Sequence, residues 1–225
     1  MQLNSYETAA DMMQSLSAEI ASQLSAALAL RDRACLAVPG GSTPGPLFDL
    51  LSQAQLDWAK VTVMLTDERW VPSDSPRSNT GLIKNRLLVN AASAAQYIPL
   101  YAAGLDHVSG AHALTQQVAP NLPLDVLVLG MGADMHTASL FPGAPELSFA
   151  QHELADAVMP MVPVASDLEP RVTLSAQALE AARQTHVLIL GDDKKAALLH
   201  AQTQSPADAP IAQFLPNATV HWSPI

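Results

Sequence analysis

The 225-residue chain has one cysteine, few basic residues and no apolar run long enough to cross a membrane. With Cys35 as the only thiol, no disulfide can form within the chain, which favours a reducing compartment. No segment approaches the roughly 18 apolar residues that a membrane helix needs, and the N-terminal residues lack a basic region followed by a hydrophobic stretch. We therefore expect a cytoplasmic protein that has no membrane partner.

Positive charge is scarce but unevenly placed. The 11 lysines and arginines face 21 acidic residues, so the net charge is -10, and this excess argues against nucleic acid and anionic membranes as partners. Four basic residues nevertheless fall within one short window: Arg69, Arg77, Lys84 and Arg86. On an acidic protein such a group is what a small anion would need, although a solvated helix face carrying ordinary charges would show the same pattern.

Short apolar segments alternate with helical patterns along most of the chain. The apolar share of 49% is enough for one substantial core, and no repeat, linker or low-complexity tract interrupts it, so residues 1–225 are predicted to form a single domain. Strands are predicted at 35–38, 61–66, 97–100, 124–129, 157–162, 172–174, 187–190 and 219–222. Helices are predicted at 8–30, 44–51, 107–118, 176–183 and 193–201, with another opening near residue 78 or 79. This alternation favours an α/β fold with a Rossmann-like, mostly parallel sheet and helices on both faces.

Unusual polar segments follow four of the predicted strands. They are GGST at 40–43, DER at 67–69, GMGADMH at 130–136 and GDDKK at 191–195. Ligands of open parallel sheets bind in the crevice beyond the carboxyl ends of the strands. We therefore expect these four segments to converge on one site.

The GGST segment predicts an anion site. Gly41, Ser42 and Thr43 precede a predicted helix that has Pro44 near its start, so backbone N–H groups and the helix dipole would favour a phosphate. The alternative is a helix cap made by Thr43, which needs no ligand. A nucleotide P-loop is excluded because the Gly-Lys-Ser/Thr ending is absent.

The DER segment adds cations and a carboxylate at the next strand end. Arg69, and Arg77 after a loop, could bind phosphate or carboxylate in a bidentate manner, and Asn79 adds an amide. Asp67 would either orient an arginine or bind sugar hydroxyls. The competing interpretation is a surface ion-pair cluster.

His136 is the candidate for proton transfer. We expect it to follow a polar turn containing Gly132 and Asp134 and to open a short helix over 137–141. The dipole at a helix start disfavours a charged imidazole, so a neutral His136 would serve as a general base. The other six histidines lack such a setting: His107, His112, His152, His186, His200 and His221.

Three other chemistries are poorly supported around His136. A dinucleotide fingerprint would need a glycine at position 135, where this chain has Met135. Asp134 and His136 alone do not complete a metal shell. No G-x-S-x-G elbow occurs, and Ser139 would lie inside the predicted short helix.

Five motifs, in this order, resemble those of the 6-phosphogluconolactonase family. They are GGSTP, DERWVP with the later SN, GMGADMHTASLFPG, RVTLS and GDDKKAAL, spread over residues 40–198. The block around His136 is the most specific, whereas GGST and DER are shared with the related glucosamine-6-phosphate deaminases. The resemblance implies a fold similar to that of glucosamine-6-phosphate deaminase and ribose-5-phosphate isomerase. It also implies a phosphorylated aldonolactone and water as substrates, no metal or organic cofactor, and a step of the oxidative pentose phosphate pathway.

The resemblance also implies residue roles. His136 would be the catalytic base, with Asp134 and Gly132 shaping its loop. Together with the segments above, the residues expected to hold the substrate are Gly41, Ser42, Thr43, Asp67, Arg69, Arg77, Asn79, Gly132, Arg171 and Lys194. The family usually has glycine where this chain has Met135, and a positive φ there would cost methionine about 1 kcal/mol or more.

Two alternatives remain at this stage. A deaminase or isomerase of the same fold would carry a glutamate in a Phe-Asn-Glu-Pro sequence, where this chain reads Ser139-Leu140-Phe141-Pro142. A sugar-phosphate sensor without catalysis would usually be joined to a DNA-binding segment, and none is recognisable. The expected assembly is a monomer or a weak homo-oligomer.

Overall fold

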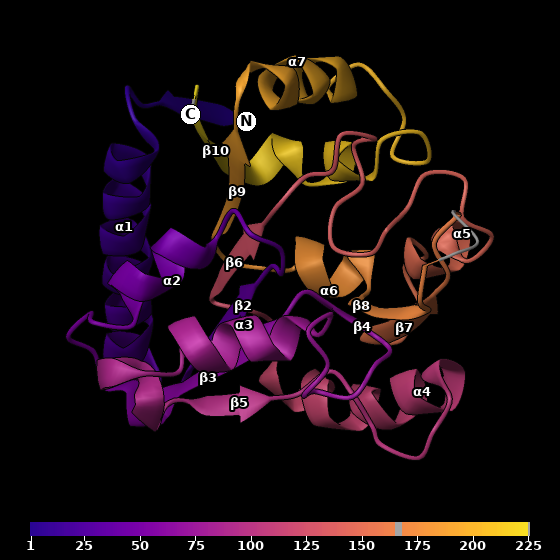
Figure 1. The fold of residues 1–225 in the computed structure, drawn as a ribbon, viewed down its shortest axis with the longest axis horizontal. Helices are drawn as coiled ribbons and strands as arrows, with labels where there is room; N and C mark the ends of the chain where they lie inside the picture. Colours follow the sequence, from indigo (N-terminus) through magenta and orange to yellow (C-terminus); the bar gives the residue numbers. More distant parts are fainter. Residues whose placement is uncertain (165–167, 225) are drawn as a thin grey trace.

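A parallel sheet of seven strands organises the protein. The computed structural model describes residues 1–164 and 168–224, and in it the strands follow the order β1-β10-β9-β6-β2-β3-β5 (Figure 1). Their bounds are β1 (Gln2–Ser5), β2 (Ala34–Val38), β3 (Val61–Leu65), β5 (Gln96–Ile98), β6 (Val126–Leu129), β9 (Thr185–Leu190) and β10 (Ala218–Ser223). Every neighbouring pair runs parallel, so the predicted α/β fold class is confirmed.

Helices and short 3-10 turns connect the strands. The helices are α1 (Ala9–Leu30), α2 (Gly45–Leu51), α3 (Asn79–Arg86), α4 (His107–Val118), α5 (Leu147–Ala150), α6 (Ala176–Glu180) and α7 (Asp192–Ala201). The 3-10 turns lie at Trp58–Lys60, Asn90–Ala94, Ala119–Asn121, Pro210–Gln213 and Leu215–Asn217. Every residue of β2, β3 and β6 is buried. Because successive side chains of a strand point to opposite faces, both faces of the sheet are covered there.

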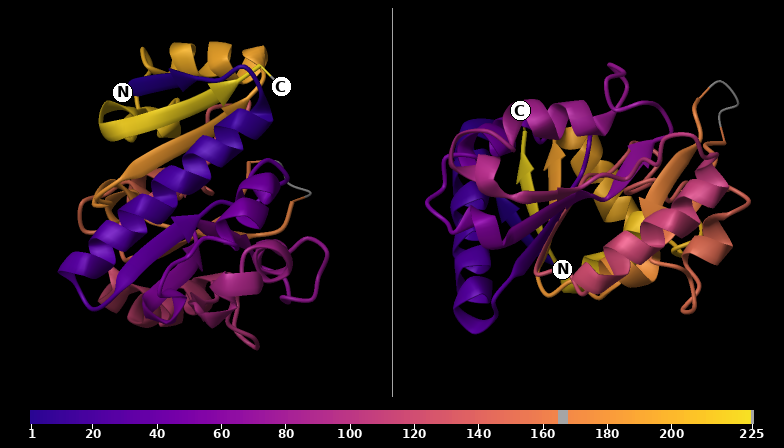
Figure 2. Two further views of the ribbon diagram at one scale, coloured as in Figure 1. Left: turned by 90° about the vertical axis from the view of Figure 1, so that its left-hand side faces the viewer. Right: turned by 90° about the horizontal axis from the view of Figure 1, so that it is seen from below.

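Helix α1 packs across one face of this sheet (Figure 2) and contacts β2, β6 and β10. Thr8 begins the helix, since its hydroxyl accepts a hydrogen bond from the backbone N–H of Asp11 at 3.1 Å. Leu16, Ile20 and Leu24 recur at four-residue intervals and are fully buried, as an amphipathic helix requires. The predicted helix at 8–30 is confirmed.

Two of the predicted strands belong to a different sheet. Strands β7 (Val158–Met161) and β8 (Arg171–Leu174) pair antiparallel with each other, and β8 pairs antiparallel with β4 (Asp67–Arg69). The sequence placed β7 and β8 in the main sheet, and it did not mark β4 as a strand because its residues, Asp-Glu-Arg, are charged. The DER segment is therefore a strand of the small antiparallel sheet and not a loop.

Smaller differences concern element ends. The strand predicted at 97–100 lies at Gln96–Ile98, the helix predicted at 176–183 ends at Glu180, and β1 was not predicted. Within residues 1–164 and 168–224, no helix has both the length and the apolar character needed to cross a bilayer.

Cys35 offers a chemical test of the sheet interior. It lies in β2 at 5% exposure, and burial, together with the charge of Asp125, raises the pKa of its thiol to about 12. Only the thiolate reacts with alkylating reagents, so at pH 8 we expect labelling of the native protein by iodoacetamide to be about a thousandfold slower than labelling of the unfolded chain. Mass spectrometry with and without guanidinium measures both rates. Equal rates would contradict the buried position of β2.

Candidate active site

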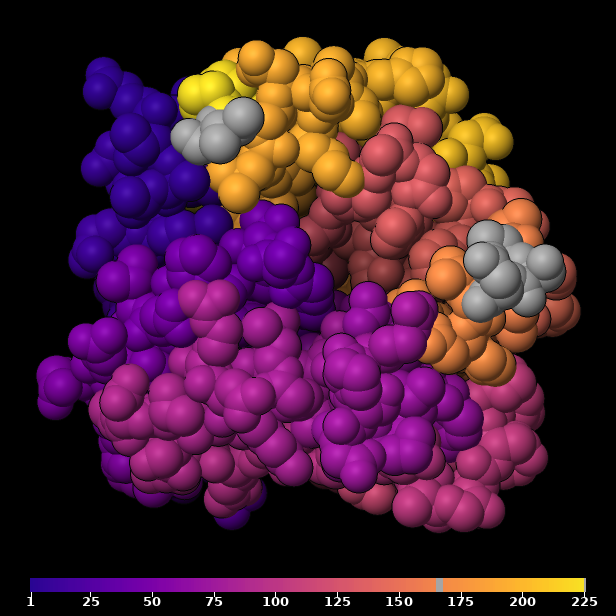
Figure 3. Space-filling model, viewed as in Figure 1, coloured from indigo at the N-terminus to yellow at the C-terminus, as the bar shows by residue number. Residues whose placement is uncertain are grey.

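A cavity of about 310 Å³ opens at the carboxyl ends of β2, β6 and β9. All four polar segments reach it, as expected for residues that follow parallel strands. Among the predicted site residues, those that line the cavity are Gly41, Ser42, Thr43, Asp67, Arg69, Asn79, Gly132, His136, Arg171 and Lys194. Asp134 and Arg77 do not line it. In Figure 3 the hollow lies near the centre of the face, between the purple residues after β2, the rose residues after β6 and the orange residues around α7.

The GGST turn forms one wall of the cavity. Gly41 has φ +87°, a conformation that favours glycine. A Cβ on Gly40 would lie 2.1 Å from Cγ of Asn79, so this glycine allows the turn to approach the start of α3. Pro44 occupies the N-cap position of α2, and no side chain makes a capping hydrogen bond at the start of that helix. The alternative interpretation of Thr43 as a helix cap is therefore wrong.

Two arginines from the small sheet also line the cavity. Arg69 and Arg171 are directly opposed in the β4–β8 ladder, and the Nε atom of each is buried without a hydrogen-bond partner among the described residues. Burial lowers the pKa of Arg171, and the charge of Arg69 acts in the same direction, while Asp67 opposes both. An anion in the cavity would compensate this concentrated positive charge.

Asp67 connects the small sheet to the turn after His136. Its carboxylate accepts hydrogen bonds from the hydroxyls of Ser139 at 2.6 Å and Thr66 at 3.2 Å. It also lies 4.0 Å from Nη1 of Arg171. Of the two roles considered for Asp67, this geometry favours orienting an arginine.

Arg77 does not line the cavity. It forms a bidentate ion pair with Glu169, with one N–O distance of 2.8 Å. Its backbone carbonyl accepts a hydrogen bond from Nη1 of Arg69 at 2.6 Å. Arg77 thus contributes through its backbone to the position of Arg69, and its side chain fits the surface ion-pair interpretation.

Glu68 supports the site without lining the cavity, a role that sequence reasoning missed. The fully buried carboxylate accepts hydrogen bonds from the backbone N–H groups of Asn79 and Thr80, both at 2.8 Å, and from the hydroxyl of Ser78, also at 2.8 Å. It thereby fixes the start of α3, including Asn79 at the cavity. The available signal was a carboxylate placed between two site residues at a strand end.

His136 pairs with Asp134 at the cavity rim. Its Nδ1 lies 2.5 Å from Oδ1 of Asp134, and this hydrogen bond is the main reason that the pKa of Asp134 is lowered. An ionised carboxylate can only accept, so Nδ1 carries a proton, and in the neutral form of the ring Nε2 would present a lone pair. Nε2 has no hydrogen-bond partner in the described part of the chain. Gly132 makes room for the ring, because a Cβ there would lie 2.2 Å from Nδ1.

The short helix predicted at 137–141 does not form. Thr137 and Leu140 instead form an isolated antiparallel bridge around a tight turn, in which Ala138 has φ +49°. Ser139 is fully buried in this turn, and its hydroxyl donates a hydrogen bond to the carboxylate of Asp67. The dipole argument for a neutral imidazole is therefore wrong, and the contact with Asp134 instead determines that Nδ1 carries a proton.

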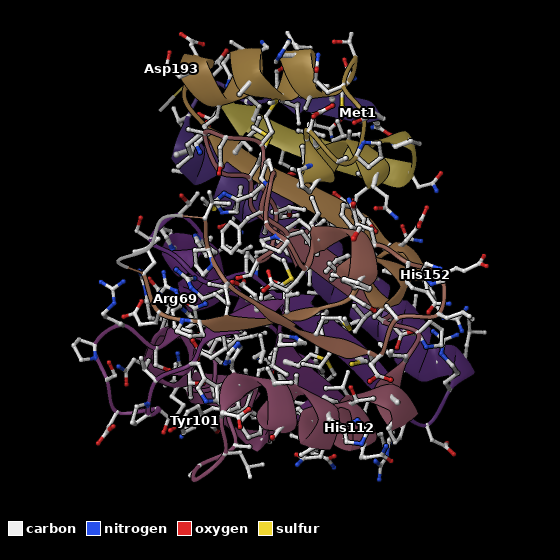
Figure 4. The ribbon with its side chains drawn as sticks, turned by 90° about the vertical axis from the view of Figure 1, so that its right-hand side faces the viewer. Met1, Arg69, Tyr101, His112, His152 and Asp193 are labelled. Carbon is white, nitrogen blue, oxygen red and sulfur yellow. The ribbon has the colours of Figure 1, made fainter. Side chains whose placement is uncertain are left out.

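Lys194 brings α7 to the same loop. Its ammonium donates a hydrogen bond to the carbonyl of Met131 at 2.8 Å. Burial lowers the pKa of Lys194, and Asp134 partly offsets this effect. His152 does not line the cavity, and Figure 4 shows it on the opposite side of that view from Arg69.

Met135 has φ +64°. The backbone strain that we expected for a methionine with positive φ is therefore present. Met135→Gly would remove the strain and the packing of the half-buried side chain, whereas Met135→Ala would remove only the packing. At ordinary positions alanine is the more stabilising of the two by about 0.5–1 kcal/mol. Here we expect the order to reverse, with the glycine variant more stable than the alanine variant by about 1 kcal/mol. Urea unfolding of both variants measures the difference, and a more stable alanine variant would contradict the strain.

Comparison with known proteins links this chain to one family. Residues 7–222 match the family model described as glucosamine-6-phosphate isomerases/6-phosphogluconolactonase. A 6-phosphogluconolactonase of Rhizobium meliloti (strain 1021) is 38% identical over 97% of both chains. One of Mesorhizobium japonicum is 40% identical over 98% of this chain and 94% of its own.

Solved structures agree with these relatives. A 6-phosphogluconolactonase structure from Shewanella baltica OS155 has a TM-score of 0.94 and 36% identity, over 99% of this chain and 97% of that one. A monomeric glucosamine-6-phosphate deaminase has a TM-score of 0.81 at 18% identity, with 99% and 97% of the two chains covered. At that identity the second likeness concerns the fold alone.

Proposed function

The chain belongs to the family of glucosamine-6-phosphate isomerases and 6-phosphogluconolactonases, and we propose that it hydrolyses 6-phospho-D-glucono-1,5-lactone to 6-phosphogluconate. This reaction is the second step of the oxidative pentose phosphate pathway. The observation that carries the proposal is the His136–Asp134 pair at 2.5 Å, with Nε2 of the imidazole unpaired, in a protein whose cavity two opposed arginines also line.

His136 acts as the general base. Nε2 takes a proton from the water that attacks C1 of the lactone, and the C1 carbonyl oxygen becomes an oxyanion in the tetrahedral intermediate. The intermediate collapses as the bond between C1 and the ring oxygen breaks, and the imidazolium returns the proton to that oxygen. The open product carries a new hydroxyl and a carboxylic acid, which ionises to the carboxylate.

Asp134 keeps His136 in the reactive tautomer. By accepting the hydrogen bond from Nδ1–H, it directs the lone pair of Nε2 outward and stabilises the imidazolium that forms during attack. The hydrogen bond holds the pKa of Asp134 below its usual range, so the carboxylate stays ionised at neutral pH.

Cations of the cavity bind the anionic substrate. Arg69 and Arg171 offer buried, unpartnered Nε atoms, and Lys194 stands beside the His136 loop. Their charge compensates the phosphate and the oxyanion, which is worth most where water is excluded. Holding the phosphate also orients the lactone toward Nε2.

A substrate comparison tests the proposal. Lactone produced in place from glucose 6-phosphate should disappear faster with the protein than by spontaneous hydrolysis. Glucosamine 6-phosphate should remain unchanged, because no carboxylate follows His136 before Glu146 to assist ring opening and proton shuttling. Conversion of the amino sugar without acceleration of lactone hydrolysis would replace the lactonase proposal with a deaminase one.

A further inference from the structure

Three side chains that line no part of the catalytic cavity meet between α1 and the sheet. Glu19 comes from α1, His186 from β9 and His221 from β10. One ligand atom of each lies within 4.8 Å of the others. Nδ1 of His186 is 3.0 Å from Nε2 of His221, which in turn is 3.9 Å from Oε2 of Glu19. Both histidines are buried, and Glu19 is partly exposed.

We propose that Glu19, His186 and His221 bind a divalent transition-metal ion, with Zn²⁺ the best match. Two imidazoles and one carboxylate form a known zinc donor set, and bonds of about 2.0–2.1 Å in a tetrahedron place neighbouring donors about 3.3 Å apart. The observed separations of 3.0 and 3.9 Å bracket that value. Because Glu19 lies at the exposed side, an ion can enter there and complete its shell with water.

The outer nitrogens of both imidazoles are already held by oxygen atoms. Nδ1 of His221 lies 2.9 Å from the hydroxyl of Tyr6, and Nε2 of His186 lies 2.8 Å from Oε1 of Gln23. Such contacts behind the ligating nitrogens orient the rings of metal-binding histidines. The amide nitrogen of Gln23 donates to Glu19 at 3.3 Å, so one side chain positions two of the three proposed ligands.

This arrangement also specifies where the protons go. The oxygen of Gln23 can only accept, so Nε2 of His186 carries a proton and Nδ1 presents its lone pair inward. Without a metal, Nε2–H of His221 donates to that lone pair. When the ion binds, His221 takes the other tautomer, and its Nδ1–H donates to the oxygen of Tyr6, whose hydroxyl lies 3.4 Å from Ser15 as a further acceptor.

Burial keeps both rings in the form that binds metal. It lowers the pKa of His186 to about 3 and that of His221 to about 4, so protons do not compete with the ion at neutral pH. Burial also raises the pKa of Glu19, and a bound cation would favour its ionised form. The site joins the N-terminal helix to β10 near the C-terminus, so its expected effect is on stability.

Metal titration of the untagged, chelator-treated protein tests the proposal. Calorimetry should detect one Zn²⁺ per chain, Co²⁺ should give the intense visible absorption of tetrahedral coordination, and Zn²⁺ should raise the unfolding temperature. Glu19→Gln keeps the size of a partly exposed side chain while removing a ligand charge. We expect it to weaken Zn²⁺ binding at least tenfold and to abolish the Co²⁺ spectrum, with lactone hydrolysis retained as evidence of folding.

The matched control is His112→Gln. His112 is an exposed histidine with Asp156 at 3.8 Å and no part in the proposed site, so this variant should bind Zn²⁺ as the unmodified protein does. No stoichiometric Zn²⁺ binding by the unmodified protein would overturn the proposal. Equal affinity in Glu19→Gln and the unmodified protein would also overturn it, because the ion would then lie elsewhere. Neither result would bear on the lactonase reaction, which uses none of these residues.

Discussion

Replacing His136 with glutamine should bring lactone hydrolysis close to the spontaneous rate. Glutamine retains a polar group near Asp134 but cannot accept and return a proton. General acid–base catalysis by a positioned side chain contributes about 10²–10⁴-fold, so we expect kcat/KM to fall by that factor. The phosphate-binding residues are unchanged, so 6-phosphogluconate should bind within a few-fold of its affinity for the unmodified protein.

Two measurements separate chemistry from folding in this variant. Steady-state hydrolysis gives the loss in kcat/KM, and calorimetry with 6-phosphogluconate gives the affinity of the cavity. His112→Gln serves here too, since His112 is exposed on α4 and outside the cavity. Retention of more than a tenth of the activity in His136→Gln would remove His136 from the role of base.

The position of the site could be predicted from the sequence because the ends of the strands can be recognised in it. The runs before Gly40, Asp67, Gly130 and Gly191 are apolar, and each is followed by an abrupt change to glycine or charge. Parallel strands carry such turns to one edge of the sheet. The cavity lining at Gly41, Asp67, Gly132 and Lys194 reflects this rule.

The small antiparallel sheet could not be predicted from the sequence in the same way. Its central strand β8 mixes apolar Val172 and Leu174 with Arg171 and Thr173. Strand β4 consists of Asp67, Glu68 and Arg69, whose pairing and hydrogen bonds involve partners ten or more residues away. Glu68 is acceptable inside the protein only because Ser78, Asn79 and Thr80 satisfy its oxygens. Local sequence carries no signal of such long-range compensation.

The helix prediction for the turn after His136 was wrong for a related reason. Residues 137–141 have enough helical character to suggest a short helix, yet a helix of one turn depends on its surroundings. Here Ser139 bonds to Asp67 and Thr137 to the carbonyl of Gly130. These contacts come from two other strand ends and hold the segment in a bridge. The small sheet therefore positions the arginines and also the loop that carries the base.

Replacing Asp134 with asparagine should lower kcat strongly while leaving the structure of the cavity intact. An asparagine amide can donate to Nδ1 and so stabilise the tautomer with the proton on Nε2, which cannot act as a base. It also cannot stabilise the imidazolium. In a serine protease triad the same exchange lowers kcat about 10⁴-fold. We expect about 10²–10³-fold here, because Asp134 is partly exposed and the lactone is a reactive substrate.

Asp193→Asn provides the matched control, since it removes one negative charge from an exposed position next to Lys194. We expect its activity to stay within about twofold of the unmodified protein, because an exposed charge is screened by solvent and salt. The decisive quantity is the ratio of kcat between the two variants at neutral pH. If both lost activity equally, the effect of Asp134 would be one of overall charge, and the 2.5 Å contact with Nδ1 of His136 would have no part in selecting the tautomer.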